Sequence, residues 1–239
     1  MKIGADIKAI FFDLDGTILP LEQSYFLKQY FKRITFFASE HGIDPDKFMG
    51  GMFAGIDAMT ANDGSRSNMD AYWQAFSSVV GMDKAQVEDI LAEFYENNFK
   101  DLREYTEPNP LALDAIRAAR LNGRKVILAT SPVFPEFVQL ERLSWVGLKK
   151  EDFDLVTAYE NSTYCKPNPE YYKEICKMID VAPEKCLMIG NDESDDMKGA
   201  AMAGLECFLV TDHRILSENF VWTGERGSFE QMVKMLERI

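Results

Sequence analysis

Two aspartates separated by one leucine are the residues of this sequence that are best suited to chemistry. Asp13 and Asp15 directly follow a short apolar run, residues 9–12, and Gly-Thr comes directly after them. Such a run predicts a strand buried on both faces, along which these two side chains point the same way. Neighbouring carboxylates repel each other unless a cation neutralises them, and Mg²⁺ binds through oxygen ligands. The pair therefore indicates a cation site, with Mg²⁺ as the obvious candidate.

More polar residues stand where other predicted strands end. These strands are expected at residues 125–130, 154–157, 186–189 and 207–210, with helices between them. The alternation predicts an α/β fold with a doubly wound parallel sheet, which binds ligands at the carboxyl ends of its strands. The groups at or just beyond these ends are Thr130, Ser131, Lys166, Asp192, Asp195 and Asp196. A carboxylate pair, a hydroxyl, a cation and an acidic cluster in one crevice are the parts that phosphoryl transfer needs.

Each of these groups also has an ordinary interpretation when it is taken alone. Thr130 could be a β-branched strand residue, and Lys166 could be a solvated surface lysine. The acids at positions 192–196 could form the acidic N-terminus of a helix that is expected over residues 195–203. Their joint order along the chain favours the functional interpretation.

The chain between residues 20 and 105 carries a different pattern. Apolar residues recur there at helical spacing, and the stretch shows no strand signal. Two prolines at positions 108 and 110 mark the return to alternating strands and helices. We therefore expect a discontinuous core, residues 1–19 and 106–239, that carries an all-helical insert, residues 20–105.

A polar loop within this insert is the candidate for contact with a substrate. It runs from residue 62 to residue 68 and contains Asn62, Arg66 and Asn68. Its composition predicts a loop, and an ordinary exposed loop is the competing interpretation.

Composition narrows the partners that we expect. The formal net charge of −13 disfavours nucleic acids and anionic membranes, which require basic patches. The four cysteines have no paired spacing and are expected to be reduced, mostly buried thiols of a cytoplasmic protein. We expect neither a signal peptide nor a transmembrane segment, and the oligomeric state is open.

The sequence Asp-Leu-Asp-Gly-Thr at 13–17, followed in order by Thr130, Lys166 and Asp192, resembles the motifs of the haloacid dehalogenase (HAD) superfamily. Most members of that superfamily are Mg²⁺-dependent phosphatases. The resemblance covers the whole chain and implies a Rossmann-like core, with the helical insert in the place of a C1 cap. It also implies a small phosphorylated metabolite as substrate.

The resemblance implies catalytic roles for matching positions. Asp13 corresponds to the nucleophile, which forms an aspartyl-phosphate, and Asp15 to the general acid and base. An aspartate at position 15 favours phosphoryl transfer over dehalogenation, because a halide leaving group needs no proton. Lys166 corresponds to the residue that neutralises charge on the nucleophile and the phosphoryl group.

The resemblance also implies the ligands of the phosphoryl group and of Mg²⁺. Thr130, Lys166 and backbone N–H groups near Leu14, Asp15 and Ser131 would bind phosphoryl oxygens. The implied metal ligands are Asp13, the backbone carbonyl of Asp15, Asp192 and Asp196, the last as a ligand or as an orienting residue.

One departure from the family pattern leaves the metal ligands open. Many relatives have Gly-Asp where this chain has Gly190-Asn191. Asp192, Asp195 and Asp196 therefore remain alternatives, with Asp192 as the first choice.

Three other functions compete with that of a phosphatase. A phosphomutase resembling β-phosphoglucomutase would use the same core. A non-catalytic protein that binds or accepts phosphoryl groups is a second alternative. A signalling receiver domain would share the acid pair, but the second acidic cluster and the long helical insert argue against it.

Overall fold

The computed structural model describes residues 3–4 and 6–239 and is built around one parallel sheet. Its strands follow the order β3-β2-β1-β4-β5-β6, and every neighbouring pair is parallel. The strands are β1 (Ala9–Phe12), β2 (Lys125–Leu128), β3 (Leu155–Val156), β4 (Cys186–Gly190), β5 (Glu206–Val210) and β6 (Arg226–Gly227). The predicted doubly wound α/β fold is confirmed. The short edge strand β6 was not predicted.

Strand β1 lies at the centre of the sheet and is completely buried. Ala9 pairs with Lys125 of β2 on one side and with Cys186 of β4 on the other. Because every side chain of β1 is covered by protein, the strand carries an unbroken apolar sequence with no alternation.

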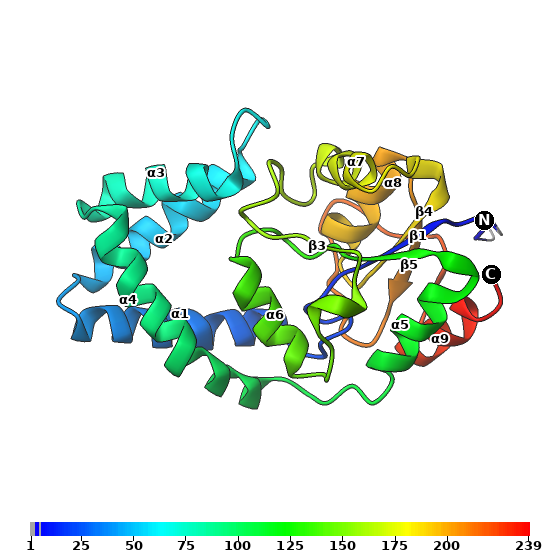
Figure 1. Cartoon of the computed structure of the whole chain (residues 1–239), viewed down its shortest axis with the longest axis horizontal. Helices are drawn as coiled ribbons and strands as arrows, with labels where there is room; N and C mark the ends of the chain where they lie inside the picture. Colours follow the sequence, from blue (N-terminus) through cyan, green and yellow to red (C-terminus); the bar gives the residue numbers. More distant parts are fainter. Residues whose placement is uncertain (1–2, 5) are drawn as a thin grey trace.

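Helices cover both faces of the sheet (Figure 1). Phe11 belongs to the apolar cluster on the face of α7 and α8, and Ile10 and Phe12 belong to the cluster on the face of α5 and α9. The helices of the core are α5 (Ala112–Arg120), α6 (Glu136–Ser144), α7 (Pro169–Met178), α8 (Gly199–Ala203) and α9 (Phe229–Leu236). Short 3₁₀ turns lie at Leu121–Gly123, Lys150–Asp152 and Pro183–Lys185.

The prediction of one continuous α-helix over residues 195–203 is wrong for its first part. The chain forms one turn of π-helix, η5 (Glu193–Lys198), and passes from it directly into α8. Asp192 begins this segment, and its side chain accepts hydrogen bonds from two backbone N–H groups of the first turn. The wider turn is tied to the polar contacts of the acidic cluster, which helical periodicity alone does not indicate.

The whole segment between β1 and α5 is helical and lies to one side of the sheet (Figure 1). It contains α1 (Gln23–Glu40), α2 (Pro45–Thr60), α3 (Asn68–Val80), α4 (Lys84–Asn97) and the 3₁₀ helix η1 (Phe99–Tyr105). The two stretches of chain that join it to the core lie side by side, because Glu107 N donates to the carbonyl of Pro20 (2.8 Å). Among the described residues, no helix is both long and apolar enough to cross a membrane.

Asn68 fastens this helical segment to the core. Its side chain is fully buried at the start of α3 and donates to the carbonyl of Tyr164 (3.2 Å). Its Oδ1 accepts from Asn62 Nδ2 (2.9 Å), and its backbone N–H donates to the carbonyl of Ser162 (2.9 Å). One buried amide thus joins two loops that are almost 100 residues apart in the sequence.

We predict that Asn68→Ala lowers the free energy of unfolding by about 1–3 kcal/mol, because it leaves buried polar groups without partners. Urea denaturation measures this loss. The exposed Asn97, at the end of α4, provides a control, and Asn97→Ala is expected to change stability by less than about 0.5 kcal/mol. Equal stabilities of the two variants would contradict the anchoring role of Asn68.

Candidate active site

Asp13 lies at the carboxyl edge of the sheet, one residue beyond β1. Its N–H donates to the carbonyl of Ile189 (2.9 Å), so the pairing of β1 with β4 continues through Asp13. The residue is only 8% exposed. The sheet itself therefore fixes the backbone from which this carboxylate projects.

A tight turn directly after Asp13 requires glycine. The carbonyl of Leu14 accepts from Thr17 N (3.1 Å), and Gly16 adopts a φ of +79°. A Cβ atom at position 16 would lie 2.3 Å from Asn191 Nδ2. Thr17 Oγ1 donates to Asn191 Oδ1 (3.0 Å), which holds the turn against the end of β4. The Gly-Thr pair thus shapes the turn that follows the two acids.

Lys166 is buried between two carboxylates. Its Nζ atom lies 2.7 Å from Asp13 Oδ1 and 2.6 Å from Asp196 Oδ1, and 2% of its side chain is exposed. Burial opposes the charge on this lysine, but Asp13 and Asp196 outweigh burial and raise its pKa well above the usual value. The ammonium group therefore stays protonated and carries a fixed positive charge into the site.

Asp196 is held by both of its carboxylate oxygens. Oδ1 binds Lys166, and Oδ2 accepts from the backbone N–H of Asp192 (3.0 Å). Burial raises the pKa of Asp196 to about 8, and Lys166 opposes this shift. A Cβ atom at Gly190 would lie 2.2 Å from Asp196 Oδ2, so glycine at this position leaves room for the carboxylate.

The remaining acids of the cluster are Asp192 and Asp195. Asp192 Oδ1 accepts from the N–H groups of Ser194 (2.7 Å) and Asp195 (2.8 Å). Burial, followed by repulsion from Asp192, raises the pKa of Asp195 to about 6, and Asp13 adds to this shift. In the described part of the chain, no three acidic, histidine or cysteine side chains are arranged to hold a metal ion as they stand. The mutual repulsion of these carboxylates is nevertheless what a divalent cation would relieve, so the donor set fits Mg²⁺.

Thr130 and Ser131 follow β2, the neighbour of β1. Ala129 N donates to the carbonyl of Phe12 (2.8 Å), which brings Thr130 alongside the segment that carries Asp13. The carbonyl of Thr130 accepts from Thr157 Oγ1 and from the Tyr171 hydroxyl, each at 2.8 Å. Thr130 is buried, and these bonds fix the backbone on which its hydroxyl stands.

Arg142 is a site residue that sequence reasoning missed. Its Nη1 atom lies 2.5 Å from Asp15 Oδ2, its side chain is 1% exposed, and Gln139 accepts a further hydrogen bond from it. Burial raises the pKa of Asp15, and Arg142 opposes that shift. Arg142 belongs to the buried face of α6, together with Val138. An arginine at an apolar position of an amphipathic helix was the signal that could have revealed this ion pair.

Two other buried polar residues near the site were also missed. Asn191 bridges Thr17 and the carbonyl of His213, to which its Nδ2 donates (2.6 Å). Glu193 is 1% exposed; burial opposes its charge, but Arg214, at 2.5 Å, and backbone N–H groups lower its pKa. Both residues tie the loop after β5 to the end of β4. A structural role for Asn191 accounts for the departure from Gly-Asp at this position.

The candidate residues of the loop at 62–68 form hydrogen bonds with other groups of the protein. Asn62 Nδ2 donates to Asn68 Oδ1 (2.9 Å) and to the carbonyl of Arg66 (3.0 Å), and the Arg66 side chain binds Gln74 on α3. Both asparagines are buried. Contact of these residues with a substrate stays a prediction, and their bonding favours a structural role.

A family model described as haloacid dehalogenase-like hydrolase matches residues 7–204. The chain is 24% identical over 209 residues to a phosphorylated carbohydrates phosphatase from Thermotoga maritima, and the alignment covers 87% of each protein. It is 26% identical over 133 residues to the pyrophosphatase PpaX from Bacillus cereus, covering 54% of this chain and 58% of that enzyme.

Solved structures share the fold along the whole chain. A HAD phosphatase from Thermococcus onnurineus superimposes with a TM-score of 0.60 at 21% identity, covering 96% of this chain and 98% of that one. A magnesium-bound putative HAD-hydrolase from Bacillus subtilis gives a TM-score of 0.56 at 20% identity, covering 96% of this chain and 98% of that one.

The buried pair of Asp15 and Arg142 can be tested by a double-mutant cycle. We predict that Asp15→Asn and Arg142→Met couple by more than about 1.5 kcal/mol in the free energy of unfolding, because either change alone leaves a partly buried polar group unpaired. The exposed pair of Asp114 and Arg117, 3.4 Å apart, is the control, and its coupling is expected to stay below about 0.5 kcal/mol. Additive effects of the two changes at Asp15 and Arg142 would show that the ion pair does not constrain the site.

Proposed function

The chain belongs to the haloacid dehalogenase-like hydrolases, and we propose that it is a Mg²⁺-dependent phosphatase that hydrolyses a small phosphomonoester through an aspartyl-phosphate. The observation that carries this proposal is the ion pair of Asp13 with Lys166 at the end of the central strand, two residues before a second, partly buried aspartate, Asp15. The two curated relatives named above are both enzymes that act on phosphorylated compounds, which supports the same activity.

In the proposed reaction, Asp13 is the nucleophile. A carboxylate oxygen of Asp13 bonds to phosphorus as the bond from phosphorus to the substrate's alcohol oxygen breaks. Lys166 orients the Asp13 carboxylate through their ion pair and offsets negative charge as the phosphoryl group approaches. Because Asp196 also binds Lys166, the ammonium group has one position, and Asp13 is held in one orientation.

Asp15 moves the protons. It donates a proton to the departing alcohol oxygen, then takes a proton from the water that attacks phosphorus and breaks the bond to Asp13. Burial favours the protonated acid and Arg142 favours the carboxylate, so the two influences on the pKa of Asp15 oppose each other. A group balanced in this way suits both halves of the reaction.

The phosphoryl oxygens would be bound by groups from three separate strand ends. We assign the Thr130 hydroxyl, the Lys166 ammonium group, and the backbone N–H groups of Leu14, Asp15 and Ser131 to this role. The bonds to the carbonyl of Thr130 support the assignment, because they hold its backbone rigid before substrate binds.

Asp13, the carbonyl of Asp15 and Asp192 would hold Mg²⁺, with Asp195 as the alternative to Asp192. Both oxygens of Asp196 are already bonded, which favours an orienting role for it over direct ligation. When bound, the cation would screen the negative charge that the phosphoryl group brings to this acidic site. The helical segment, residues 20–105, is assigned as a cap that excludes bulk water from the site.

Two variants separate the two halves of the reaction. With p-nitrophenyl phosphate, we predict that Asp13→Asn releases no nitrophenolate. Asp15→Asn is expected to release about one equivalent per enzyme and then to turn over about 10²–10⁴-fold more slowly than the unmodified enzyme. Nitrophenolate leaves without a proton, so the first step survives the loss of Asp15 while hydrolysis of the aspartyl-phosphate does not. Rapid-mixing absorbance measurements resolve the burst.

The control for this experiment is Asp46→Asn, an exposed position at the start of α2, which is expected to retain full turnover. Full turnover by Asp13→Asn would reject covalent catalysis at this residue. Turnover that depends on an added sugar bisphosphate would favour a phosphomutase instead.

The metal assignment has a readout that does not depend on activity. We predict that Mg²⁺ raises the melting temperature of the protein above its value in EDTA, by about 2–4 °C for each kcal/mol of binding free energy. Asp192→Asn is expected to reduce this shift, and EDTA is expected to abolish turnover until Mg²⁺ is restored. Calorimetry and a phosphate-release assay measure the two effects. Metal-independent turnover would contradict the assignment.

A further inference from the structure

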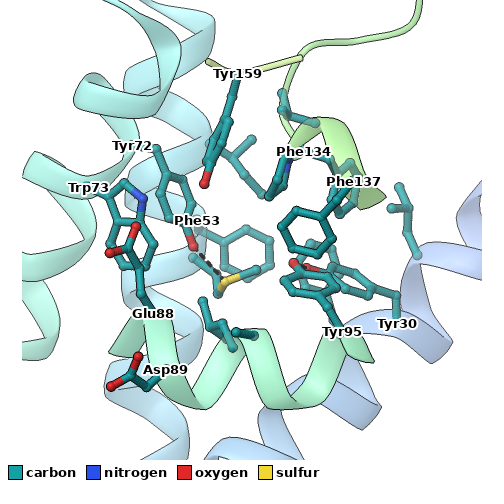
Figure 2. Close-up of a pocket in the computed structure, with 18 residues that line it drawn as sticks. Tyr30, Phe53, Tyr72, Trp73, Glu88, Asp89, Tyr95, Phe134, Phe137 and Tyr159 are labelled. Carbon is teal, nitrogen blue, oxygen red and sulfur yellow. Dashed lines mark hydrogen bonds between the residues drawn. The ribbon is translucent and has the colours of Figure 1, made fainter. Parts of the chain in front are cut away.

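A large cavity separates the helical segment from the core. Its volume is about 540 Å³, and it is walled by α1–α4, by the loop that joins β2 to α6, by Phe137 at the start of α6, and by Tyr159 (Figure 2). A volume of this size suits a small organic molecule. Neither the motifs of the sequence nor the proposed mechanism assigns a ligand to it.

The walls of this cavity are strongly apolar and aromatic. Tyr30, Tyr72, Trp73, Phe134 and Phe137 are among the rings that line it (Figure 2). Nine of the eighteen described lining residues are aromatic. Surfaces of this kind bind flat apolar groups through edge and face contacts between rings.

Three of the hydroxyl groups that line the cavity are already hydrogen-bonded, which disfavours a sugar as ligand. The hydroxyls of Tyr30 and Tyr95 bond to each other (2.7 Å), and the hydroxyl of Tyr72 donates to Met52 Sδ (3.0 Å). These hydroxyls are therefore already engaged. A sugar would lose hydrogen bonds to water here with few replacements.

The charged groups of the cavity disfavour an anionic ligand. The only charged side chains among its described lining residues are the carboxylates Glu88 and Asp89, which would repel a second phosphate. The buried Trp73 Nε1 atom interacts with the hydroxyl of Tyr159, which also lines the cavity, and Trp73 is 6% exposed. Trp73 and Tyr159 thus provide one small polar spot for a ligand with a single acceptor, such as an ether or phenol oxygen.

Two contacting side chains, Phe134 and Arg142, connect the cavity to the proposed acid and base. Phe134 lines the cavity, and its ring centre is 4.7 Å from the guanidinium carbon of Arg142. Arg142 in turn binds Asp15. A leaving group in the cavity would therefore have to pass Phe134 and Arg142 to take a proton from Asp15.

From these observations we infer that the cavity binds the leaving group of the substrate and selects phosphomonoesters of apolar, aromatic alcohols that carry no second anionic group. The inference rests on the proposed phosphatase activity. It gives the substrate a chemical class that differs from carbohydrates and from pyrophosphate, the compounds for which the two curated relatives are named.

A series of phosphate esters of primary alcohols tests this class, because their leaving groups have similar intrinsic reactivity. We predict that kcat/KM for naphthylethyl phosphate exceeds that for glucose 6-phosphate by about 100-fold, the scale expected for burying a two-ring group. Pyrophosphate is expected to be a poorer substrate still. A preference for glucose 6-phosphate or pyrophosphate over the naphthyl ester would overturn the inference while leaving the phosphatase in place.

Two cavity residues can be shortened without disturbing a buried core. Phe53 and Phe137 are 50% and 51% exposed. Each change to alanine is expected to lower kcat/KM for naphthylethyl phosphate about 10-fold and to leave that for methyl phosphate unchanged, since methanol does not reach the cavity. Phe36→Ala, which alters a 64% exposed residue outside the cavity, is the matched control. Equal losses on both esters, or none, would contradict a leaving-group site.

Binding of the product alcohol separates this inference from the proposed function. By calorimetry, naphthylethanol is expected to bind the unmodified protein and to bind Phe137→Ala about 10-fold more weakly, whereas glycerol is expected not to bind. Binding without hydrolysis of any phosphomonoester would support the apolar site and reject the phosphatase. Absence of naphthylethanol binding in an enzyme that hydrolyses phosphomonoesters would reject the apolar site alone.

Discussion

The buried ammonium group of Lys166 is the interaction on which the site depends. It lies between Asp13 and Asp196, which stand on separate strand ends, and it places one positive charge within a chain of net charge −13. Removing it would leave carboxylates buried close together with no cation of the protein between them, which is costly in a medium of low polarity. The same contact that holds two strand ends together also orients the proposed nucleophile.

This arrangement is supported by the local structure around it. The loop that carries Lys166 runs into α7, where the Asn168 side chain accepts from Glu170 N at the first turn. At the end of β4, Gly190 leaves the space that the Asp196 carboxylate occupies. Catalytic groups held in this way need little rearrangement when charge develops in a reaction. The sheet thus positions the proposed catalytic groups, and the helical segment provides most of the described residues that line the apolar cavity.

Much of the fold and part of the site could be predicted from the sequence. Apolar runs such as residues 9–12 indicate burial on both faces, and parallel strands bring their carboxyl ends to one edge. This reasoning predicts that Asp13 lies near Lys166, and the two residues form an ion pair in the structure. Arg142 was missed because its partner Asp15 is 127 residues away in the chain; its place on the apolar face of α6 indicates a buried charge but does not identify the partner. The cavity was missed for a related reason, since its rings come from separate helices that each read as ordinary amphipathic elements.

The most direct measurement of the central claim is a crystal structure of the protein with beryllofluoride and Mg²⁺, because beryllofluoride bonds to a carboxylate in the way that a phosphoryl group does. The account predicts that beryllium is bonded to an Asp13 carboxylate oxygen, with its fluorides within hydrogen-bond distance of Lys166 Nζ and Thr130 Oγ1. Beryllofluoride on Asp15 or Asp192, or a complex in which Lys166 faces away from it, would contradict the account.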